Sequence, residues 1–401
     1  MHVPDGFINA PVSVATGVVA VAAVGVSLRG ARRELAAGGP GGEALAPMAG
    51  LVAAFIFAVQ MLNFPVAAGT SGHLLGGALA AILVGPFTAV LCVSVVLLMQ
   101  GVLFADGGLT ALGVNITDMA ITTTVVAYLV FRLLVKVLPR RRSSVTGAAF
   151  VSALVSVPAA ACVFTLVYAL GGTTDIPIGR VFTAMVGVHV LIGIGEAVIT
   201  AATVGAVLAV RPDLVHGARG LSKPLELRTS PLTPVRPGEA RTAQAGGEAA
   251  PAEPAARPEP AARPEPAAAE QDAAPAAQPQ AAAPRRRSVR GLWIAGLLVA
   301  VVCAGGISYY ASSSPDGLEK VAHDQGIDKN ETDHASKDSP LAGYSVKDIT
   351  DARLSGGLAG VIGVGVTLAV GSGVFLVVRR RRGGAQDPAG ITVPGAERET
   401  V

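Results

Sequence analysis

Long apolar runs that end in clusters of arginine constrain this chain more than any other feature. Such clusters follow apolar runs at residues 29–33, 140–142 and 379–382. Of the 401 residues, 51% are hydrophobic and only 15% are charged, which is typical of a membrane protein. Glycine contributes 49 residues, and small residues allow membrane helices to approach closely. The sequence therefore predicts an all-α polytopic membrane protein built as a packed bundle.

The apolar runs predict about seven helices, followed by a C-terminal two-helix transmembrane hairpin. A helix needs roughly 20 apolar residues to cross a bilayer, and shorter ones are possible where neighbours bury them. The third predicted helix is short, so it either crosses the bilayer or re-enters it. The predicted helices are residues 8–28, 47–64, 73–84, 86–104, 116–138, 147–170, 181–210, 292–311 and 354–378.

The positions of Lys and Arg predict the orientation in the cell membrane. With the N-terminus external, every strongly basic turn falls on the cytoplasmic side, as the positive-inside rule requires. The C-terminus is then cytoplasmic. Met1, His2 and His73 share the external face. We expect the start of the chain to be retained, because no secretory signal pattern precedes the first apolar run.

Composition divides the chain into four regions. Residues 1–211 form the helical bundle, and residues 291–382 form the hairpin with one external loop. Between them, residues 212–290 contain a near-repeated Pro/Ala pattern with scattered charge. Such a segment buries too little apolar surface to offset its ordering entropy, so we predict a disordered cytoplasmic linker. Residues 383–401 form a cytoplasmic tail.

The first two residues form a candidate metal chelate. The amine of Met1, the backbone nitrogen of His2 and its imidazole can close a five-membered and a six-membered ring around one ion. Nitrogen-rich planar sets suit Ni(II), Cu(II) or Co(II) better than Mg(II) or Ca(II). The alternative is an initiator methionine followed by a histidine that has no role in binding.

His73 is the second candidate ligand. It lies between glycines, at the predicted start of the third helix and on the same face as His2. By itself it fits an interfacial histidine bonded to a loop carbonyl. Together with His2 it favours a metal site, because histidine is the commonest metal ligand.

Other polar residues at membrane depth are candidates for supporting or structural roles. Some lie near the external side and could orient the ligands, although helix capping explains Asn115 equally well. His189 and Glu196 are seven residues apart on one helix face, and we favour an interhelical structural pair over a role in transport. The candidates for orienting the ligands are Gln60, Asn63, Ser71, Asn115 and Asp118.

Several function classes lack their motifs. The sequence contains no phosphate-binding Gly-x-x-x-x-Gly-Lys-Ser/Thr loop, so we expect no ATP site in this chain. It contains neither His-Glu-x-x-His nor Gly-x-Ser-x-Gly, and thus gives hydrolytic chemistry no support. A basic face with interleaved aromatic residues, which nucleic-acid binding would need, is also missing. We therefore expect neither catalytic residues nor an organic cofactor in this chain.

Three motifs resemble a known family. They are Met-His-Val-Pro-Asp-Gly-Phe at the start, the Asn-Phe-Pro-Val run with Thr-Ser-Gly-His at 63–83, and Asp-Gly-Gly-Leu-Thr-Ala-Leu-Gly at 106–113. Residues 1–211 resemble the CbiM/NikM substrate-capture components of energy-coupling factor transporters for cobalt and nickel. Residues 291–382 carry Ser-Pro-Asp-Gly-Leu-Glu and resemble the PDGLE domain, which is similar to CbiN/NikN subunits. The linker has no counterpart in the family and suggests a fusion of two genes.

The resemblance implies a ligand set and partners. One Co(II) or Ni(II) ion, the transported substrate, would be bound by the Met1 amine, the backbone nitrogen and side chain of His2, and His73. A separate transmembrane coupling subunit and cytoplasmic ABC-type ATPases would drive transport. Two alternatives remain open: a stand-alone metal channel or secondary transporter, with His189 and Glu196 as its proton relay, and an intramembrane enzyme that uses the metal as a Lewis acid.

Overall fold

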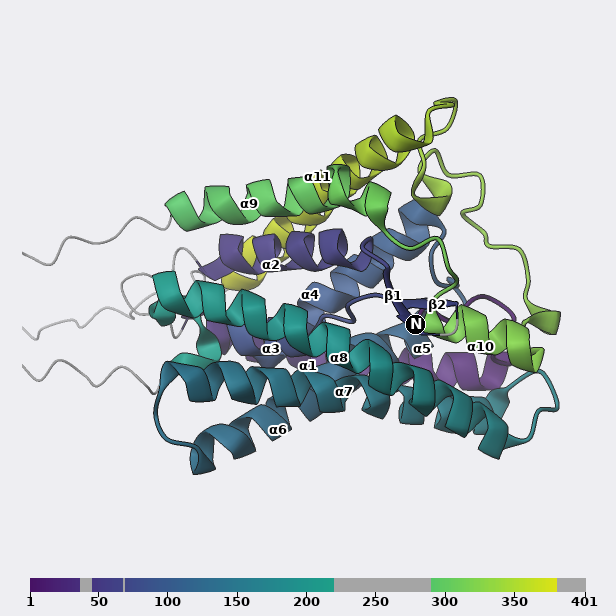
Figure 1. Ribbon diagram of the computed structural model, residues 1–401, viewed down its shortest axis with the longest axis horizontal. Coiled ribbons are helices and arrows are strands. Elements are labelled where there is room, and N and C mark those ends of the chain that lie inside the picture. The colour runs from purple at the N-terminus through teal and green to yellow at the C-terminus, as the bar shows by residue number, and fades with distance from the viewer. Residues whose placement is uncertain (37–44, 68, 220–289, 381–401) are drawn as a thin grey trace, which may run out of the picture. The chain divides into compact units, whose positions relative to one another are not determined.

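The computed structural model describes residues 1–36, 45–67, 69–219 and 290–380, and the prediction of an all-α membrane protein is confirmed. These residues belong to one compact unit (Figure 1). Nearly all of the predicted linker and the whole predicted tail lie outside the described residues. The bundle comprises α1 (Ala10–Ala36), α2 (Leu45–Gln60), β1 (Phe64–Ala67), β2 (Thr70–Gly72), α3 (Gly77–Val84), α4 (Pro86–Met99), η2 (Gln100–Phe104), α5 (Leu112–Asn115), η3 (Ile116–Thr122), α6 (Thr123–Val137), α7 (Arg142–Gly171), α8 (Ile178–Val210), η4 (Pro212–Leu214) and η5 (His216–Ala218). The C-terminal part comprises α9 (Arg290–Gly305), η6 (Ile307–Tyr310), α10 (Gly317–Gln325), η7 (Ile327–Asn330), η8 (Ala342–Tyr344) and α11 (Ala352–Arg380).

Seven of the described helices are long and apolar enough to cross a membrane, and two of the predicted ones are shorter. α2 has 16 residues, and α3 has 8, which amounts to about 12 Å of helix. Every residue of α3 is buried, so protein rather than lipid surrounds it. α3 also begins four residues later than predicted, at Gly77. His73 therefore lies in the extended segment before the helix, not at its head.

The segment before α3 is held away from helical geometry by two features. Gly76 has a φ of 92°, a left-handed conformation that residues with a Cβ rarely adopt. The Glu196 carboxylate of α8 accepts hydrogen bonds from the amides of Leu75 (2.7 Å) and Gly76 (3.1 Å). Backbone amides at a helix start lack hydrogen-bond partners within the helix, and Glu196 is the acceptor for these two amides.

The C-terminal hairpin packs on α2. α11 and α9 both contact α2, and α11 makes the more extensive interface. A Cβ added to Gly50 of α2 would lie 2.2 Å from Oγ of Ser372, so the two backbones approach too closely for a larger residue. Close packing of small residues is how membrane helices associate without a hydrophobic drive between them.

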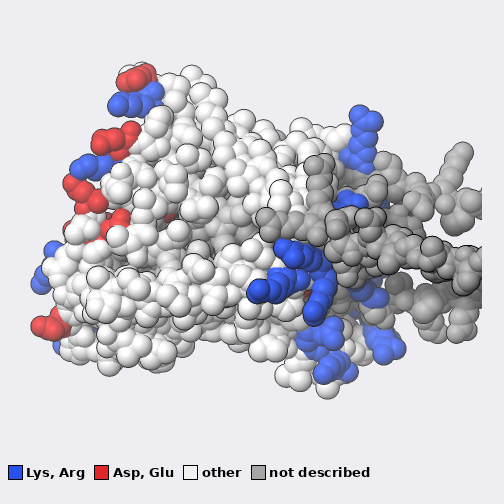
Figure 2. Space-filling model, turned by 180° about the vertical axis from the view of Figure 1, so that it is seen from behind, with Lys and Arg blue, Asp and Glu red and all other residues white. Residues whose placement is uncertain are grey.

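Charged residues gather at the two ends of the described unit. Figure 2 shows Lys and Arg concentrated at one end and Asp and Glu mostly at the other. The basic end includes the last turn of α1, with Arg33, and the last turn of α6, with Lys136. The acidic end includes the loop that carries α10. This separation follows the pattern on which the orientation was predicted.

The folded bundle continues beyond residue 211, where the sequence analysis ended it. η4 and η5 turn back against the helices, and Val215 is fully buried. The Tyr128 hydroxyl of α6 lies 3.5 Å from Nε2 of His216. The sequence analysis ended the bundle at the composition change at Pro212. It missed η4 and η5 because two such short turns cannot show an apolar period.

Candidate metal centre

The N-terminal segment is threaded into the protein rather than left free. Met1 is 2% exposed and Val3 is fully buried. The Asn115 side chain clamps the backbone of Val3 in both directions: its Oδ1 accepts from the Val3 amide at 2.7 Å, and its Nδ2 donates to the Val3 carbonyl at 3.1 Å. The Asp5 carboxylate accepts from the amide of Thr110 at 2.8 Å. These contacts fix where the first two residues lie.

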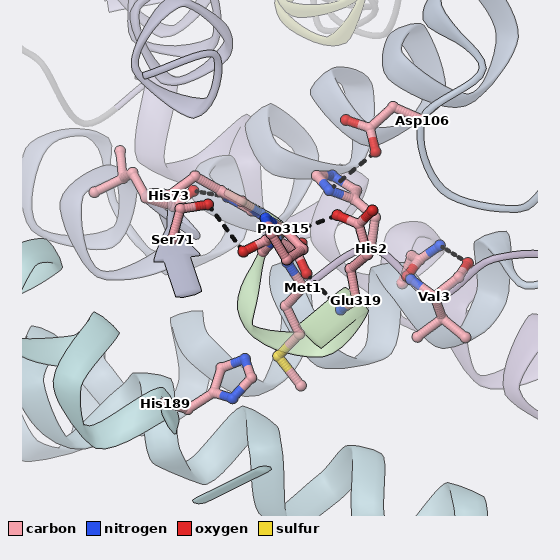
Figure 3. A network of polar contacts seen from close by, with 12 residues as sticks. Met1, His2, Val3, Ser71, His73, Asp106, His189, Pro315 and Glu319 are labelled. Carbon is pink, nitrogen blue, oxygen red and sulfur yellow. Dashed lines mark hydrogen bonds and ion pairs between the residues drawn. The ribbon is translucent and has the colours of Figure 1, made fainter. Parts of the chain in front are cut away.

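The amine of Met1 meets two side chains that come from distant parts of the sequence (Figure 3). It lies 2.7 Å from Nε2 of His73 and 2.8 Å from Oδ2 of Asp316. Nε2 of His73 and Oδ2 of Asp316 are 3.6 Å apart. His2, His73 and Asp316 each offer one ligand atom, and these atoms all lie within 4.8 Å of one another. This is the one such cluster found among the described residues.

The tautomer of His73 suits metal binding. Its Nδ1 lies 3.0 Å from the Leu74 carbonyl and donates to it, so Nε2 keeps its lone pair and faces the amine. Metal-binding histidines commonly donate their other ring N–H to a carbonyl in this way. The ring stands just after the β1–β2 hairpin, whose short strands the sequence analysis treated as a loop.

His2 stacks on His73 and is held from its far side. The two rings are nearly parallel, at 23°, with centroids 5.0 Å apart. Nε2 of His2 bonds to Oε1 of Gln100 at 3.1 Å, and Nδ1 lies 3.3 Å from Oδ1 of Asp106. Tyr344 connects both partners, because its hydroxyl donates to Asp106 and accepts from Gln100.

Burial and charge set the protonation of this centre. Burial lowers the pKa of His2 to about 4, with the N-terminal ammonium and His73 adding to the decrease and Asp106 opposing it. The imidazole is therefore neutral at neutral pH, which is the form that binds metals. Burial acts to raise the pKa of Asp316, but the ammonium of Met1 and His73 outweigh it, and that pKa lies well below its usual range.

The residues predicted to orient the ligands lie in three kinds of surroundings. Asn115 clamps the N-terminal segment as described, and Gln60 donates to the Leu75 carbonyl at 3.0 Å, next to His73. Ser71 and Asn63 contact the C-terminal part: Oγ of Ser71 donates to the Ser314 carbonyl at 2.7 Å, and the Asn63 carbonyl accepts from the Ser312 amide. Asp118 is fully buried in η3, and its carboxylate has no hydrogen-bond partner among the described residues.

His189 and Glu196 do not bond to each other. Glu196 instead accepts from the backbone amides of Leu75 and Gly76, so within the described residues it does not form the interhelical pair that we favoured. Nδ1 of His189 donates to the Met185 carbonyl at 2.7 Å, and its buried Nε2 has no partner within the described part of the chain. Figure 3 shows the Met1 side chain pointing toward the His189 ring.

The sequence analysis missed four residues of this centre. Gln100, Asp106 and Tyr344 hold His2, and Asp316 contacts the amine. A signal existed for Asp316: Asp-x-x-Glu is a capping box, and Asp316 does begin α10 through its bond from the Glu319 amide. That signal predicts a helix start but not the contact with Met1.

Two pockets adjoin the centre on the side of the loop that carries α10. The larger, of about 770 Å³, is lined by His2, Asp106 and Asp316 together with further acidic and histidine side chains. The smaller, of about 420 Å³, reaches His73 and Tyr344. An ion can therefore approach His2 and Asp316 without crossing the bundle.

Comparison with known proteins decides the family. The family model described as CbiM, cobalt uptake substrate-specific transmembrane region, matches residues 2–214, and the PDGLE domain matches residues 290–380. The chain belongs to the CbiM family. This agrees with the resemblance drawn from the three motifs, and the second match places a PDGLE domain at the C-terminal hairpin.

Relatives share this organisation in part. A protein of Haloquadratum walsbyi described as a metal transport protein is 38% identical over 54% of this chain and 93% of its own length. The fused nickel transport protein NikMN of Rhodobacter capsulatus is 41% identical over 33% of this chain and 37% of its own length. The cobalt transport protein CbiM of Sorangium cellulosum is 34% identical over 42% of this chain and 77% of its own length.

One solved structure, titled a truncated transition metal transporter, is 28% identical, with a TM-score of 0.45 over 52% of this chain and 99% of that one. The names of the three relatives describe transport and not catalysis. They agree with the expectation of a transport component and give no support to the intramembrane enzyme.

Proposed function

We propose that this chain captures Co(II) or Ni(II) at the outer face of the cell membrane as the substrate-binding component of an energy-coupling factor importer. The metal would be bound by the amine of Met1, the backbone nitrogen and imidazole of His2, and Nε2 of His73. Residues 1–211 would form the metal-binding domain and residues 291–382 its PDGLE hairpin. The N-terminus would be external, and the C-terminus cytoplasmic.

The observation that carries this proposal is the buried contact between the Met1 amine and Nε2 of His73 at 2.7 Å. Two nitrogens that each bind one ion at about 2.0–2.1 Å, at a right angle, lie roughly 2.9 Å apart. The two atoms are thus already spaced as neighbouring ligands. The names of the cobalt and nickel relatives support the choice of metal.

The experiment is metal analysis of the purified full-length chain with an unmodified N-terminus. We expect about one nickel or cobalt ion per chain, and its loss in His73→Ala and His2→Ala. His216→Ala serves as the matched control, since His216 lies in η5 and contacts Tyr128 rather than the candidate centre. Full metal content in His73→Ala would place the site elsewhere.

The partners are part of the proposal. The resemblance to substrate-capture components implies a separate transmembrane coupling subunit and cytoplasmic ABC-type ATPases, and a sequence without a phosphate-binding loop of its own is consistent with this. Uptake of radioactive cobalt or nickel by cells that express the chain should stop when the ATPases are deleted. Uptake that persists, and that fails in His189→Ala or Glu196→Gln, would instead favour a secondary transporter.

A further inference from the structure

We propose that Asp316 of the PDGLE segment is an additional ligand of the captured metal and supplies the negative charge that neutralises the site. This inference rests on the proposed function, because it concerns the same ion. It gives the C-terminal hairpin a direct part in binding: the hairpin brings a carboxylate oxygen to a site whose other ligands are nitrogens of the first 73 residues.

The spacing of the donor atoms supports a shared ion. The Met1 amine, Nε2 of His73 and Oδ2 of Asp316 form a triangle with sides of 2.7, 2.8 and 3.6 Å. Ligands at about 2.0–2.1 Å from one ion are roughly 2.9 Å apart at right angles and roughly 3.6 Å apart at 120°. All three sides fall close to that range, so the carboxylate oxygen is within reach of an ion that binds the other two atoms.

The two oxygens of Asp316 have separate tasks. Oδ1 accepts from the Glu319 amide at 2.8 Å and begins α10, whereas Oδ2 faces the Met1 amine. The segment before it is fixed to the bundle: the Pro315 carbonyl accepts from the Ser71 amide at 2.8 Å. The side chain of Asp316 is 16% exposed and that of Met1 is not exposed at all. The fold therefore holds Oδ2 at the site independently of any ion.

The charge of the proposed complex also favours the Asp316 carboxylate as a ligand. A doubly charged ion bound by a neutral amine, a deprotonated backbone amide and two neutral imidazoles carries a net charge of +1. A net charge in a buried place is costly unless it is paired. One carboxylate brings the total to zero. Nitrogen and oxygen ligands in a tetragonal arrangement also suit Ni(II) and Cu(II).

The test compares Asp316→Asn and Asp316→Ser in the full-length chain with its native N-terminus. Asn and Ser both begin helices well, so α10 keeps its cap while the carboxylate is removed. Asp324→Asn is the matched control, because Asp324 lies on the same helix and pairs with Lys320 instead of Met1. Ni(II) affinity is measured by competition with a chromophoric chelator, and the ligand atoms by X-ray absorption of the nickel complex.

We expect both Asp316 variants to bind Ni(II) about 10–100-fold more weakly and to lose an oxygen ligand, while the control stays unchanged. Affinity equal to or above that of the unmodified chain, with the same absorption spectrum, would overturn the inference. Asp316 would then only pair with the ammonium of the metal-free protein. His73→Ala tells the two proposals apart. If the unmodified chain binds nickel, His73→Ala does not, and the Asp316 variants bind normally, only the role of Asp316 is wrong. If the unmodified chain itself binds no nickel, the proposed function is wrong as well.

Discussion

The N-terminal segment, residues 1–9, and the loop of the C-terminal part, residues 311–351, both enclose the candidate metal centre, but they are fastened differently. The N-terminal segment is tied through its backbone to several elements: Asn115 holds Val3, and Thr173 bonds the carbonyls of Gly6 and Phe7. The loop also has backbone bonds to the bundle, at Pro315 and Thr332, but farther along it is tied through single side chains, such as Ser339 to the Leu103 carbonyl and His334 to the Gly107 carbonyl.

Burial follows the same division. Met1, Val3 and Phe7 are each no more than 2% exposed, whereas most residues of the loop are half-buried or exposed. Segments with few buried apolar contacts open at a lower free energy than the core does. We therefore expect the N-terminal segment to be preorganised and the loop to be the part of the enclosure that opens more easily. Four changes separate the two contributions.

The largest expected effect comes from lengthening the N-terminus. One residue added before Met1 replaces the amine by an amide and needs space where Met1 is 2% exposed. We expect metal affinity to fall more than about 100-fold, because an amide nitrogen is a far poorer ligand and the chelate is lost. Metal content of the purified protein measures this. The control is the same residue added at the C-terminus. Full metal content in the N-terminal variant would contradict the prediction that the Met1 amine binds the metal.

Asn115→Ala removes the clamp on Val3 but no ligand. It leaves the buried Val3 amide without a hydrogen-bond partner, which lowers the stability of the fold by about 1–3 kcal/mol. It also releases the segment that positions Met1 and His2. We expect Ni(II) binding to weaken about 10–100-fold, as with other groups that orient ligands. Asn9→Ala, at an exposed position that bonds to Val12, should leave affinity unchanged. Equal affinities in both variants would mean that the segment holds its place without the clamp.

Tyr344→Phe tests the loop side and should have a smaller effect. The hydroxyl bridges Asp106 and Gln100, while the ring stacks on Phe104 at 4.9 Å and would remain. Loss of such hydrogen bonds corresponds to roughly a 2- to 10-fold change in affinity. Titration with Ni(II) measures it, with Tyr310→Phe, at 82% exposure, as the control. A loss of Ni(II) affinity as large as that in Asn115→Ala would show that the loop and the N-terminal segment position the site equally.

The smallest effect should follow from separating the two parts of the chain. Residues 1–222 and 288–401, produced together as two chains, keep the interface between α2 and the helices α9 and α11. We expect the tagged hairpin to co-purify with the bundle and metal content to change less than about twofold, since the linker mainly raises the effective concentration. A hairpin that fails to co-purify would show that the interface needs the covalent connection.

The sequence predicted the long helices because an apolar run marks each of them, but α1 ends eight residues later than predicted and α9 six residues earlier. α7 and α8 differ from their predicted bounds mainly at their first turns. The same reasoning placed Met1, His2 and His73 at one end, and the structure has them in contact. Their role as ligands stays a prediction.

Sequence reasoning failed where partners are distant or elements are short. Asp316 meets Met1 across 315 positions, and no local pattern connects the two. The β1–β2 hairpin has strands of four and three residues, too few to show an alternation. Asp118 was predicted from its polarity near the external side to orient the ligands, yet the structure shows no hydrogen bond that connects its carboxylate to them.

The short helix α2 has a consequence for how the protein is made. Its main neighbour α11 and the helix α9 come from the end of the chain, and about 230 residues separate Gln60 from Arg290. At roughly 5–20 residues per second, a ribosome takes about 10–50 s to synthesise that stretch. During this interval α2, only 16 residues long, must stay in the bilayer without the helices that cover it in the finished protein. The last-made helices thus complete the burial of one of the first.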